Sequence, residues 1–140
     1  EPVHLLVRRG HRLARMTDLT VQDLMDFDWV MPGPEAILTR SVLARLAALG
    51  LPQPPQRFAT ASFLLTLAMV QQSNAIAPLA RAVCDQFGTG PDAPYAVLPL
   101  DLGIVVEPFG LMTRSGTILT PAAQRLVGMI TTGTSDAGLD

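Results

Sequence analysis

The sequence has very little cysteine and histidine, the residues most often used for disulfides, metal sites and nucleophilic catalysis. Cys84 is the one cysteine among 140 residues, and His4 and His11 are the two histidines. A single cysteine excludes a disulfide within the chain and any zinc cluster built on several thiolates. It is also typical of proteins in a reducing compartment, so a cytoplasmic location is expected.

Charge is scarce as well, and lysine is absent. Charged residues make up 16% of the chain, all ten basic residues are arginines, and the formal net charge is −2. A surface that binds duplex DNA needs clustered cations to displace phosphate counterions. The cluster Arg8, Arg9, Arg12 and Arg15 is interpreted as a solvated segment after a strand, and the chain itself is not expected to bind nucleic acid.

No apolar run is long enough to span a membrane, although 49% of the residues are hydrophobic. The longest such segment, residues 58–70, contains Thr60, Ser62 and Thr66 and falls short of the roughly 20 residues that a spanning helix needs. The opening residues, Glu-Pro-Val-His-Leu, lack the basic-then-apolar pattern of a signal peptide and are expected to begin directly on a strand. We therefore expect no membrane contact.

Short apolar runs alternate with helical patterns along the chain. Strands are predicted over residues 3–8, 29–31, 57–59, 75–77, 95–100 and 104–113, and helices over 20–27, 35–49, 63–72, 78–87 and 120–130. Thr20 is the expected cap of the first helix, while Pro34 and Pro78 are expected to open two others. This order predicts an α/β fold, Rossmann-like, with a mainly parallel sheet and helices on both faces. Residues 1–130 are expected to form the domain, and 131–140 a mobile tail.

The helix predicted over residues 63–72 is apolar on nearly every face. Such a helix is typically buried between layers rather than lying on the surface. An alternative is that its apolar surface faces a partner chain.

Four stretches, in this order, resemble the effector-binding domain of LysR-type transcriptional regulators, and in particular its second lobe. The strand of residues 5–9 followed by Gly-His-Arg-Leu-Ala at 10–14 is similar to that family's strand followed by Gly-His-Pro-Leu-Ala. Residues 20–24 (TVQDL) and 29–32 (WVMP) resemble its helix and its tryptophan-bearing strand. Residues 109–114 (FGLMTR) and 120–123 (TPAA) resemble its return strand and last helix.

The chain departs from the family pattern at two places. Arg12 stands where the family usually has proline. Residues 70–78 (VQQSNAIAP) stand where it usually has Val-x-x-Gly-x-Gly-Ile and a later proline, so Ser73 and Ala75 replace both glycines. We expect the turn from helix to strand at this place to have a different geometry from that of the family.

The resemblance implies a periplasmic-binding-protein-like architecture in which two α/β lobes close on a small effector. It implies that this chain is the second lobe with the returning C-terminal helix. The winged helix-turn-helix that contacts DNA, and most of the first lobe, are then expected to lie outside this sequence. The resemblance also implies a protein that is not an enzyme, has no cofactor, and forms homodimers or higher oligomers.

Two junctions between a strand and a helix are the predicted ligand contacts. In open α/β sheets, ligands bind beyond the carboxyl ends of strands, where helix N-termini present N–H groups. One junction consists of Met31, Pro32, Gly33 and Pro34, and the other of Thr60, Ala61, Ser62 and Phe63. The resembling family places effector contacts at the same two junctions. Their neutral, polar character suits an organic acid, an aromatic acid or a sugar-like effector equally.

The alternative that Thr60 and Ser62 act only as helix caps stays open, since capping and ligand contact are compatible. The remaining chemistry-bearing residues predict no metal and no catalytic site. His4 and His11 lack the spacing of zinc ligands, and Cys84 is expected to be a buried, inert thiol. Asp23, Asp26 and Asp28 are interpreted as the flank of a helix.

Three rival classes remain open at this point. A lobe of an extracytoplasmic solute-binding protein would share the architecture. A module that only oligomerises would need no ligand. A small α/β enzyme would need a nucleophile–base pair or a metal cluster, and the sequence offers neither pattern.

Overall fold

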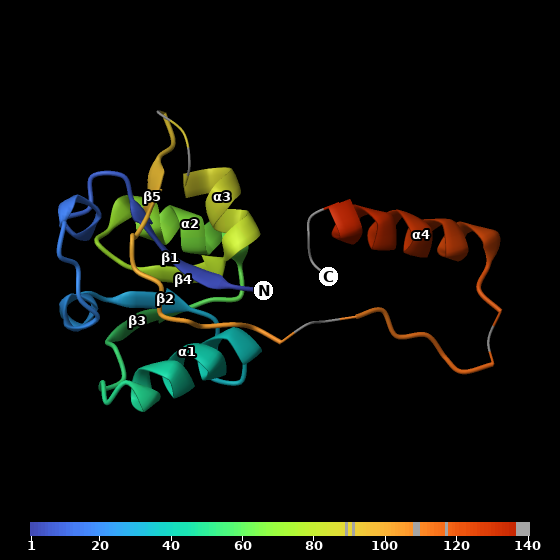
Figure 1. Ribbon diagram of the computed structural model, residues 1–140, viewed down its shortest axis with the longest axis horizontal. Helices are drawn as coiled ribbons and strands as arrows, with labels where there is room; N and C mark the ends of the chain where they lie inside the picture. The colour runs from blue at the N-terminus through green and yellow to red at the C-terminus, as the bar shows by residue number, and fades with distance from the viewer. Residues whose placement is uncertain (89, 91, 108–109, 117, 137–140) are drawn as a thin grey trace. The chain divides into compact units, whose positions relative to one another are not determined.

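The computed structural model describes residues 1–88, 90, 92–107, 110–116 and 118–136, without the side chains of residues 57 and 133–136. The chain forms two compact units, Glu1–Val106 and Glu107–Asp140. The larger unit contains β1 (Val3–Arg8), η1 (Leu13–Arg15), η2 (Gln22–Asp26), β2 (Trp29–Met31), α1 (Ile37–Ala48), β3 (Gln56–Ala59), α2 (Phe63–Gln72), β4 (Ala77–Ala80), α3 (Arg81–Gly88) and β5 (Tyr95–Val97) (Figure 1). The smaller unit contains α4 (Pro121–Asp136).

β1 is buried on both faces, because successive side chains of a strand point to opposite sides. Leu5 and Val7 belong to one apolar core, which also contains Trp29 and residues of α1. Leu6 points into a second core, formed with residues of α2, α3 and β5. Figure 1 shows α2 and α3 on one side of these strands and α1 on the other. The predicted α/β architecture with helices on both faces is therefore confirmed.

The strands form an antiparallel group in the order β4-β1-β5 and a parallel pair, β2-β3. Val3 lies opposite Ala80, and Arg8 lies opposite Tyr95. Among the described residues, the prediction of a mainly parallel sheet is therefore wrong. The direction of a strand depends on pairing between distant segments, which local alternation of strands and helices does not specify.

Ile76 joins the two groups of strands. It forms a parallel bridge with Trp29, donates a backbone hydrogen bond to Asp28 O and accepts one from Val30 N, both at 2.9 Å. The residues that follow it pair with β1, so this segment uses both of its edges.

Pro78 lies within β4, opposite Leu5, and does not open a helix as predicted. Arg81 N donates to Pro2 O at 2.9 Å. Antiparallel pairs alternate between hydrogen-bonded and non-hydrogen-bonded positions. Counting back from Arg81, Pro78 falls at a non-hydrogen-bonded position, where its missing N–H costs nothing to the ladder with β1. α3 begins three residues later, at Arg81.

Other predicted boundaries also differ from the structure. α1 begins at Ile37 after the cap residue Ala36, so Pro34 precedes the helix instead of opening it. The segment predicted as a helix over 20–27 is a short 3-10 helix, and Thr20 donates its hydroxyl to Asp23 Oδ2 at 2.6 Å instead of capping it.

The prediction of a strand over 104–113 is wrong among its described residues, where Val105 makes only an isolated bridge with Pro2; residues 108 and 109 lie outside the described part. α4 continues past residue 130 to Asp136. Of the predicted mobile tail, residues 137–140 lie outside the described residues, and its mobility stays a prediction.

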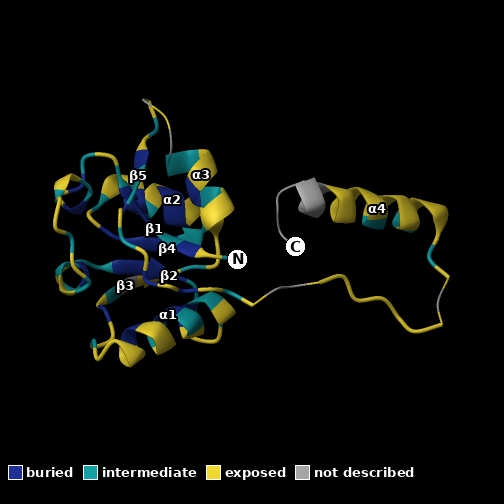
Figure 2. Ribbon diagram, viewed as in Figure 1, coloured by how far each residue is buried: buried dark blue, intermediate teal, exposed yellow. Residues whose placement is uncertain are grey.

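α2 is buried along one side only, which corrects the prediction of burial on every face. Thr66, Leu67 and Val70 are buried, whereas Leu64 is 77% exposed and Leu65 41% exposed. Figure 2 shows this alternation of buried and exposed surface along the helix. The helix packs through the second core and leaves an apolar strip uncovered near its N-terminus.

The two ends of the larger unit run side by side. Glu1 donates from its ammonium group to Val106 O at 3.0 Å, and Val106 N donates to Glu1 O at 3.0 Å. Val3 N donates to Ile104 O at 3.0 Å, and Pro2 bridges Val105. The first and last residues of this unit are thus hydrogen-bonded to each other.

His11 anchors the segment after β1. Its ring is fully buried and packs against Phe27, with 4.7 Å between the ring centroids. Leu13 N donates to Nδ1 at 3.1 Å, so Nε2 is the protonated nitrogen and donates to Asn74 O at 3.0 Å. Burial lowers the pKa of His11, and the nearby cations Arg8 and Arg12 lower it further, against a smaller opposing effect of the Asn74 hydrogen bond. The histidine is therefore a neutral structural residue, as predicted.

Within the described residues, no helix combines the length and the hydropathy needed to cross a bilayer.

We expect the free energy of unfolding to fall as the pH drops from about 7 towards 5. The pKa of His11 is lower in the folded state than the roughly 6.5 of an unfolded chain, so the unfolded state binds more protons in this range. Urea unfolding at a series of pH values measures the slope. His11→Gln should reduce the slope; equal slopes for the wild type and His11→Gln would contradict this account.

Candidate functional site

The structure brings the two predicted junctions side by side. β2 and β3 are parallel, and their last residues, Met31 and Ala59, are register partners. Thr60 N donates to Met31 O at 3.0 Å, which ties the start of one junction to the start of the other. Both junctions thus leave the same edge of the parallel pair, where ligands of α/β proteins bind.

The first junction presents backbone and open space instead of reactive side chains. The Met31 side chain is fully buried in the core, so this residue can offer a ligand only its main chain. Pro32 O accepts a hydrogen bond from the hydroxyl of buried Thr39 at 2.9 Å. Gly33 O accepts from Ala36 N at 3.0 Å, and a Cβ built at Gly33 would meet no atom within 4 Å. Pro34 is exposed beside this space.

The second junction is a capped helix N-terminus. Ser62 N donates to Thr60 Oγ1 at 3.0 Å, and Leu65 N donates to Ser62 Oγ at 3.4 Å. Both hydroxyls accept local bonds, so the capping role is present, while each keeps a hydrogen to donate. The first N–H groups of a helix have no partner inside it. Among the described residues, those of Phe63 and Leu64 are left for an outside acceptor.

This edge is open rather than enclosed. Ala61 and Ser62 are exposed, and Phe63 is 38% exposed. Two cavities, of about 580 and 460 Å³, lie elsewhere: one beside Arg8 and Asn74, the other along α4. We favour the junctions as the ligand contact because strand-end geometry and helix N–H groups coincide there, but such an edge holds a ligand firmly only with a second wall.

Among the described residues, no three or more histidine, cysteine or acidic side chains are grouped so that they could hold a metal ion. Cys84 is buried on α3, with Sγ 3.7 Å from Leu79 O. Burial, with a contribution from nearby Asp85, raises the pKa of its thiol to about 12. The prediction that Cys84 is buried is confirmed.

Two supporting residues were not predicted from the sequence. Thr39 lies in the first turn of α1, and its hydroxyl donates a hydrogen bond to Pro32 O. Gln56 Nε2 donates to the same Pro32 O at 3.4 Å. The available signal for Thr39 was a threonine on the otherwise apolar buried side of α1, which also carries Val42 and Leu46. Gln56 gave no such signal, because its contact depends on the register of β2 and β3.

These features define an α/β unit that presents two junctions, each between a strand and a helix, at one edge of a parallel strand pair. The sequence matches the family of LysR substrate binding domains over residues 1–135. The chain therefore belongs to this family of transcriptional regulators, whose members are not enzymes.

Known relatives agree with this assignment. The chain is 40% identical over 92 residues to the HTH-type transcriptional regulator GbpR of Rhizobium radiobacter, covering 66% of this chain and 30% of that protein. It is 30% identical over 125 residues to GbpR of Azospirillum brasilense, covering 89% of this chain and 36% of that protein. The chain thus spans about a third of the length of these relatives.

Solved structures share the fold at low sequence identity. The regulatory domain of CcmR from Synechocystis PCC6803, in complex with 2-PG, superposes with a TM-score of 0.68 at 15% identity, covering 95% of this chain and 62% of that one. The effector binding domain of QuiR in complex with shikimate gives a TM-score of 0.58 at 16% identity, covering 89% of this chain and 56% of that one.

Replacing the cap should destabilise the helix at this edge. We expect Ser62→Ala to lower the free energy of unfolding by about 0.5–2 kcal/mol, because Leu65 N loses its acceptor. Ser62→Asp, which retains a side-chain acceptor, should lose much less. Urea unfolding measures both, with Ser41→Ala on α1 as the control for a serine that caps nothing; an equal loss for Ser41→Ala and Ser62→Ala would refute the capping role.

Proposed function

We propose that this chain is the effector-sensing lobe of a LysR-type, DNA-binding transcriptional regulator, with the edge formed by residues 31–34 and 60–63 as one wall of its effector site. The observation that carries the proposal is the parallel register of β2 and β3, with the bond from Thr60 N to Met31 O. It supports the proposal because the junction that contains Gly33 and the junction that leads into α2 both start from this strand edge.

The chemistry of this edge favours an effector that carries a carboxylate or several hydroxyl groups. The N–H groups of Phe63 and Leu64 and the positive end of the helix dipole attract an oxygen anion. Hydroxyls of Thr60 and Ser62 can donate to the same group. The described junction residues carry no charge, which suits an organic acid, an aromatic acid or a sugar-like molecule. Shikimate, bound by QuiR, is a hydroxylated carboxylic acid of this kind.

This chain spans about a third of the length of its relatives, which supports an effector site shared with a further lobe. An effector held between two lobes changes their closure only if it binds one closure state more tightly than the other. In a full-length regulator, the change in lobe closure would alter the position of a helix-turn-helix, which is the only part proposed to contact DNA. The full-length protein is proposed to form homodimers or higher oligomers in the cytoplasm. The match to transcriptional regulators favours this reading over an extracytoplasmic solute-binding protein.

The exposed strip on α2 favours assembly as a second candidate function. Leu64, Leu65 and Phe63 expose apolar surface next to the predicted site. A partner chain covering this strip would make the lobe an oligomerisation module that needs no ligand. The two functions separate experimentally, because a ligand shifts stability at fixed protein concentration and assembly shifts mass with concentration.

The test is thermal unfolding of a regulator-length polypeptide containing this chain, against a panel of organic acids, aromatic acids and sugars. A ligand at about 100 times its Kd should stabilise the protein by about 2.7 kcal/mol and raise its melting temperature by several degrees. Gly33→Ala should abolish the shift without lowering the melting temperature of the free protein, because the added methyl fills ligand space and meets no protein atom. Thr60→Val should weaken the shift.

The exposed variant Arg40→Gln on α1 is the matched control and should keep the full response. A flat panel, together with a mass that rises with concentration, would replace sensing by assembly. A response that Gly33→Ala and Thr60→Val both retain would place the effector away from this edge.

A further inference from the structure

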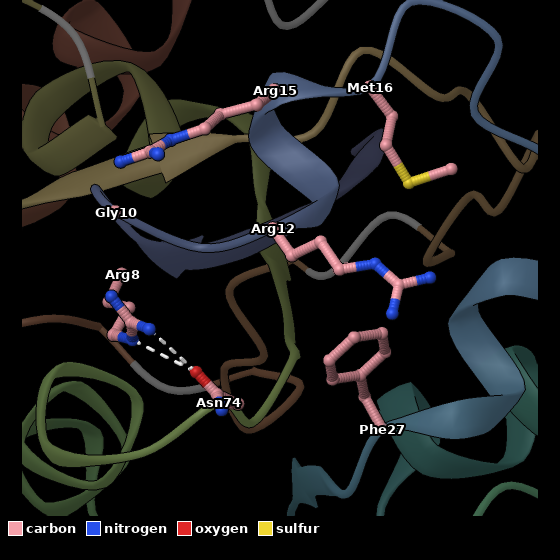
Figure 3. Close-up of a pocket in the computed structure, with 7 residues that line it drawn as sticks. All are labelled: Arg8, Gly10, Arg12, Arg15, Met16, Phe27 and Asn74. Carbon is pink, nitrogen blue, oxygen red and sulfur yellow. Dashed lines mark hydrogen bonds between the residues drawn. The ribbon is translucent and has the colours of Figure 1, made fainter.

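A cavity of about 580 Å³ lies beside the end of β1, and Arg8, Arg12 and Arg15 all line it (Figure 3). Its position is opposite to that of the proposed effector edge. Arg8 ends β1, which runs antiparallel to β4, and Asn74 of the same cavity stands two residues before Ile76, the partner of Trp29 at the start of β2. The cavity therefore lies at the amino ends of β2 and β4, whereas the junctions lie at the carboxyl ends of β2 and β3.

Arg8 is held in a fixed orientation. Its Nε and Nη2 atoms donate to Asn74 Oδ1 at 3.0 and 2.8 Å (Figure 3). The backbone of Asn74 is fixed in turn, because its carbonyl oxygen accepts from His11 Nε2 at 3.0 Å. Ser73, the preceding residue, accepts from Ala75 N at 3.1 Å and donates to Met69 O at 2.6 Å. The third guanidinium nitrogen, Nη1, takes no part in these two hydrogen bonds with Asn74.

Gly10 explains where that nitrogen lies. A Cβ built at Gly10 would stand 2.9 Å from Arg8 Nη1 and 3.9 Å from Arg15 Nη2. One nitrogen of each guanidinium group thus lies close to Gly10. The φ angle of Gly10 is not in the left-handed region, so a side chain at this position would be opposed by the Arg8 guanidinium and not by the backbone conformation.

The charge of this cavity is not neutralised by the described residues. None of its three arginines forms an ion pair with a carboxylate there. Asp23 interacts only weakly with Arg12, because the pKa of its carboxyl is lowered mainly by hydrogen bonds from Thr20 and least by Arg12. His11 is neutral and adds no charge to the cavity. Guanidinium groups that line one cavity without a paired carboxylate repel one another, and an oxyanion bound among them lowers this repulsion through charge-assisted hydrogen bonds.

The other wall of the cavity is apolar. Phe27 and Met16 line it and are half-buried, and Figure 3 shows the Arg12 side chain extending towards the Phe27 ring. The volume falls within the range of about 300–1,000 Å³ found for small-molecule sites and exceeds what a bare oxyanion would fill.

We propose that this cavity is a second ligand site, distinct from the effector edge, that binds a small organic oxyanion. Arg8 and Arg15 hold its phosphate or carboxylate group over Gly10, and an aromatic or apolar portion packs on Phe27 and Met16 beside Arg12. The site does not depend on the proposed effector edge.

The experiment is calorimetric titration of the 140-residue chain, in a low-salt buffer free of phosphate, with phenyl phosphate, benzoate, inorganic phosphate and benzyl alcohol. We expect the cavity to bind the aromatic anions more tightly than inorganic phosphate and not to bind the uncharged alcohol. The tighter of phenyl phosphate and benzoate identifies the anionic group. Arg15→Gln should weaken binding by about 10- to 100-fold, and Gly10→Ala should weaken it by displacing Arg8.

Arg40→Gln removes one positive charge elsewhere and should bind as the wild type does, whereas Thr60→Val reports any binding at the effector edge. Circular dichroism establishes that each variant is folded. If Arg15→Gln and Arg40→Gln weakened binding equally, binding would depend only on the net charge of the chain, and the proposal would be overturned. Binding of duplex DNA with no binding of any small anion would overturn it in favour of a nucleic-acid surface. Loss of binding in Thr60→Val alone would assign the anion to the effector edge.

Discussion

Residues 75–80 hydrogen-bond along both of their edges, and both candidate sites depend on this arrangement. On one edge Ile76 exchanges bonds with Asp28 and Val30, and on the other the residues from Ala77 to Ala80 pair with β1. If this segment shifted, the parallel pair would separate from the antiparallel group, and the two buried faces of β1 would lose their common support. The fixed position of these bonds sets which residues come together at each end of the strands.

The two ends differ in how they could hold an anion. At the carboxyl ends, the attraction comes from main-chain N–H groups and hydroxyls, which are neutral and close to a helix terminus. At the amino ends it comes from full charges on arginine side chains, of which Arg8 is anchored by Asn74. Interactions of exposed charges weaken with salt more than those of backbone donors. The two sites would therefore respond differently to ionic conditions within the same lobe.

The sequence predicts local features of this fold well and distant pairings poorly. α2 begins at Phe63 and ends at Gln72, as predicted, because a capping serine and a continuous apolar pattern are local signals. Pro78 was misassigned because its place in a strand depends on β1, more than 70 residues earlier. The adjacency of the two junctions could be predicted, because the carboxyl ends of neighbouring parallel strands meet at one edge. The burial of the Met31 side chain could not be predicted in this way. The arginine cavity escaped prediction since Arg8 meets Asn74 across 66 residues, and a cluster of cations alone suggests only a solvated surface.

The ribbon between residues 1–3 and 104–106 gives the larger unit a single point of entry and exit. A segment with adjacent ends behaves as a cassette, because its replacement changes no distance in the chain that carries it. Recombination between related regulators could therefore exchange this unit in one piece, provided that the short ribbon is kept. The proposed ligand specificity could then be inherited or engineered independently of the rest of the regulator.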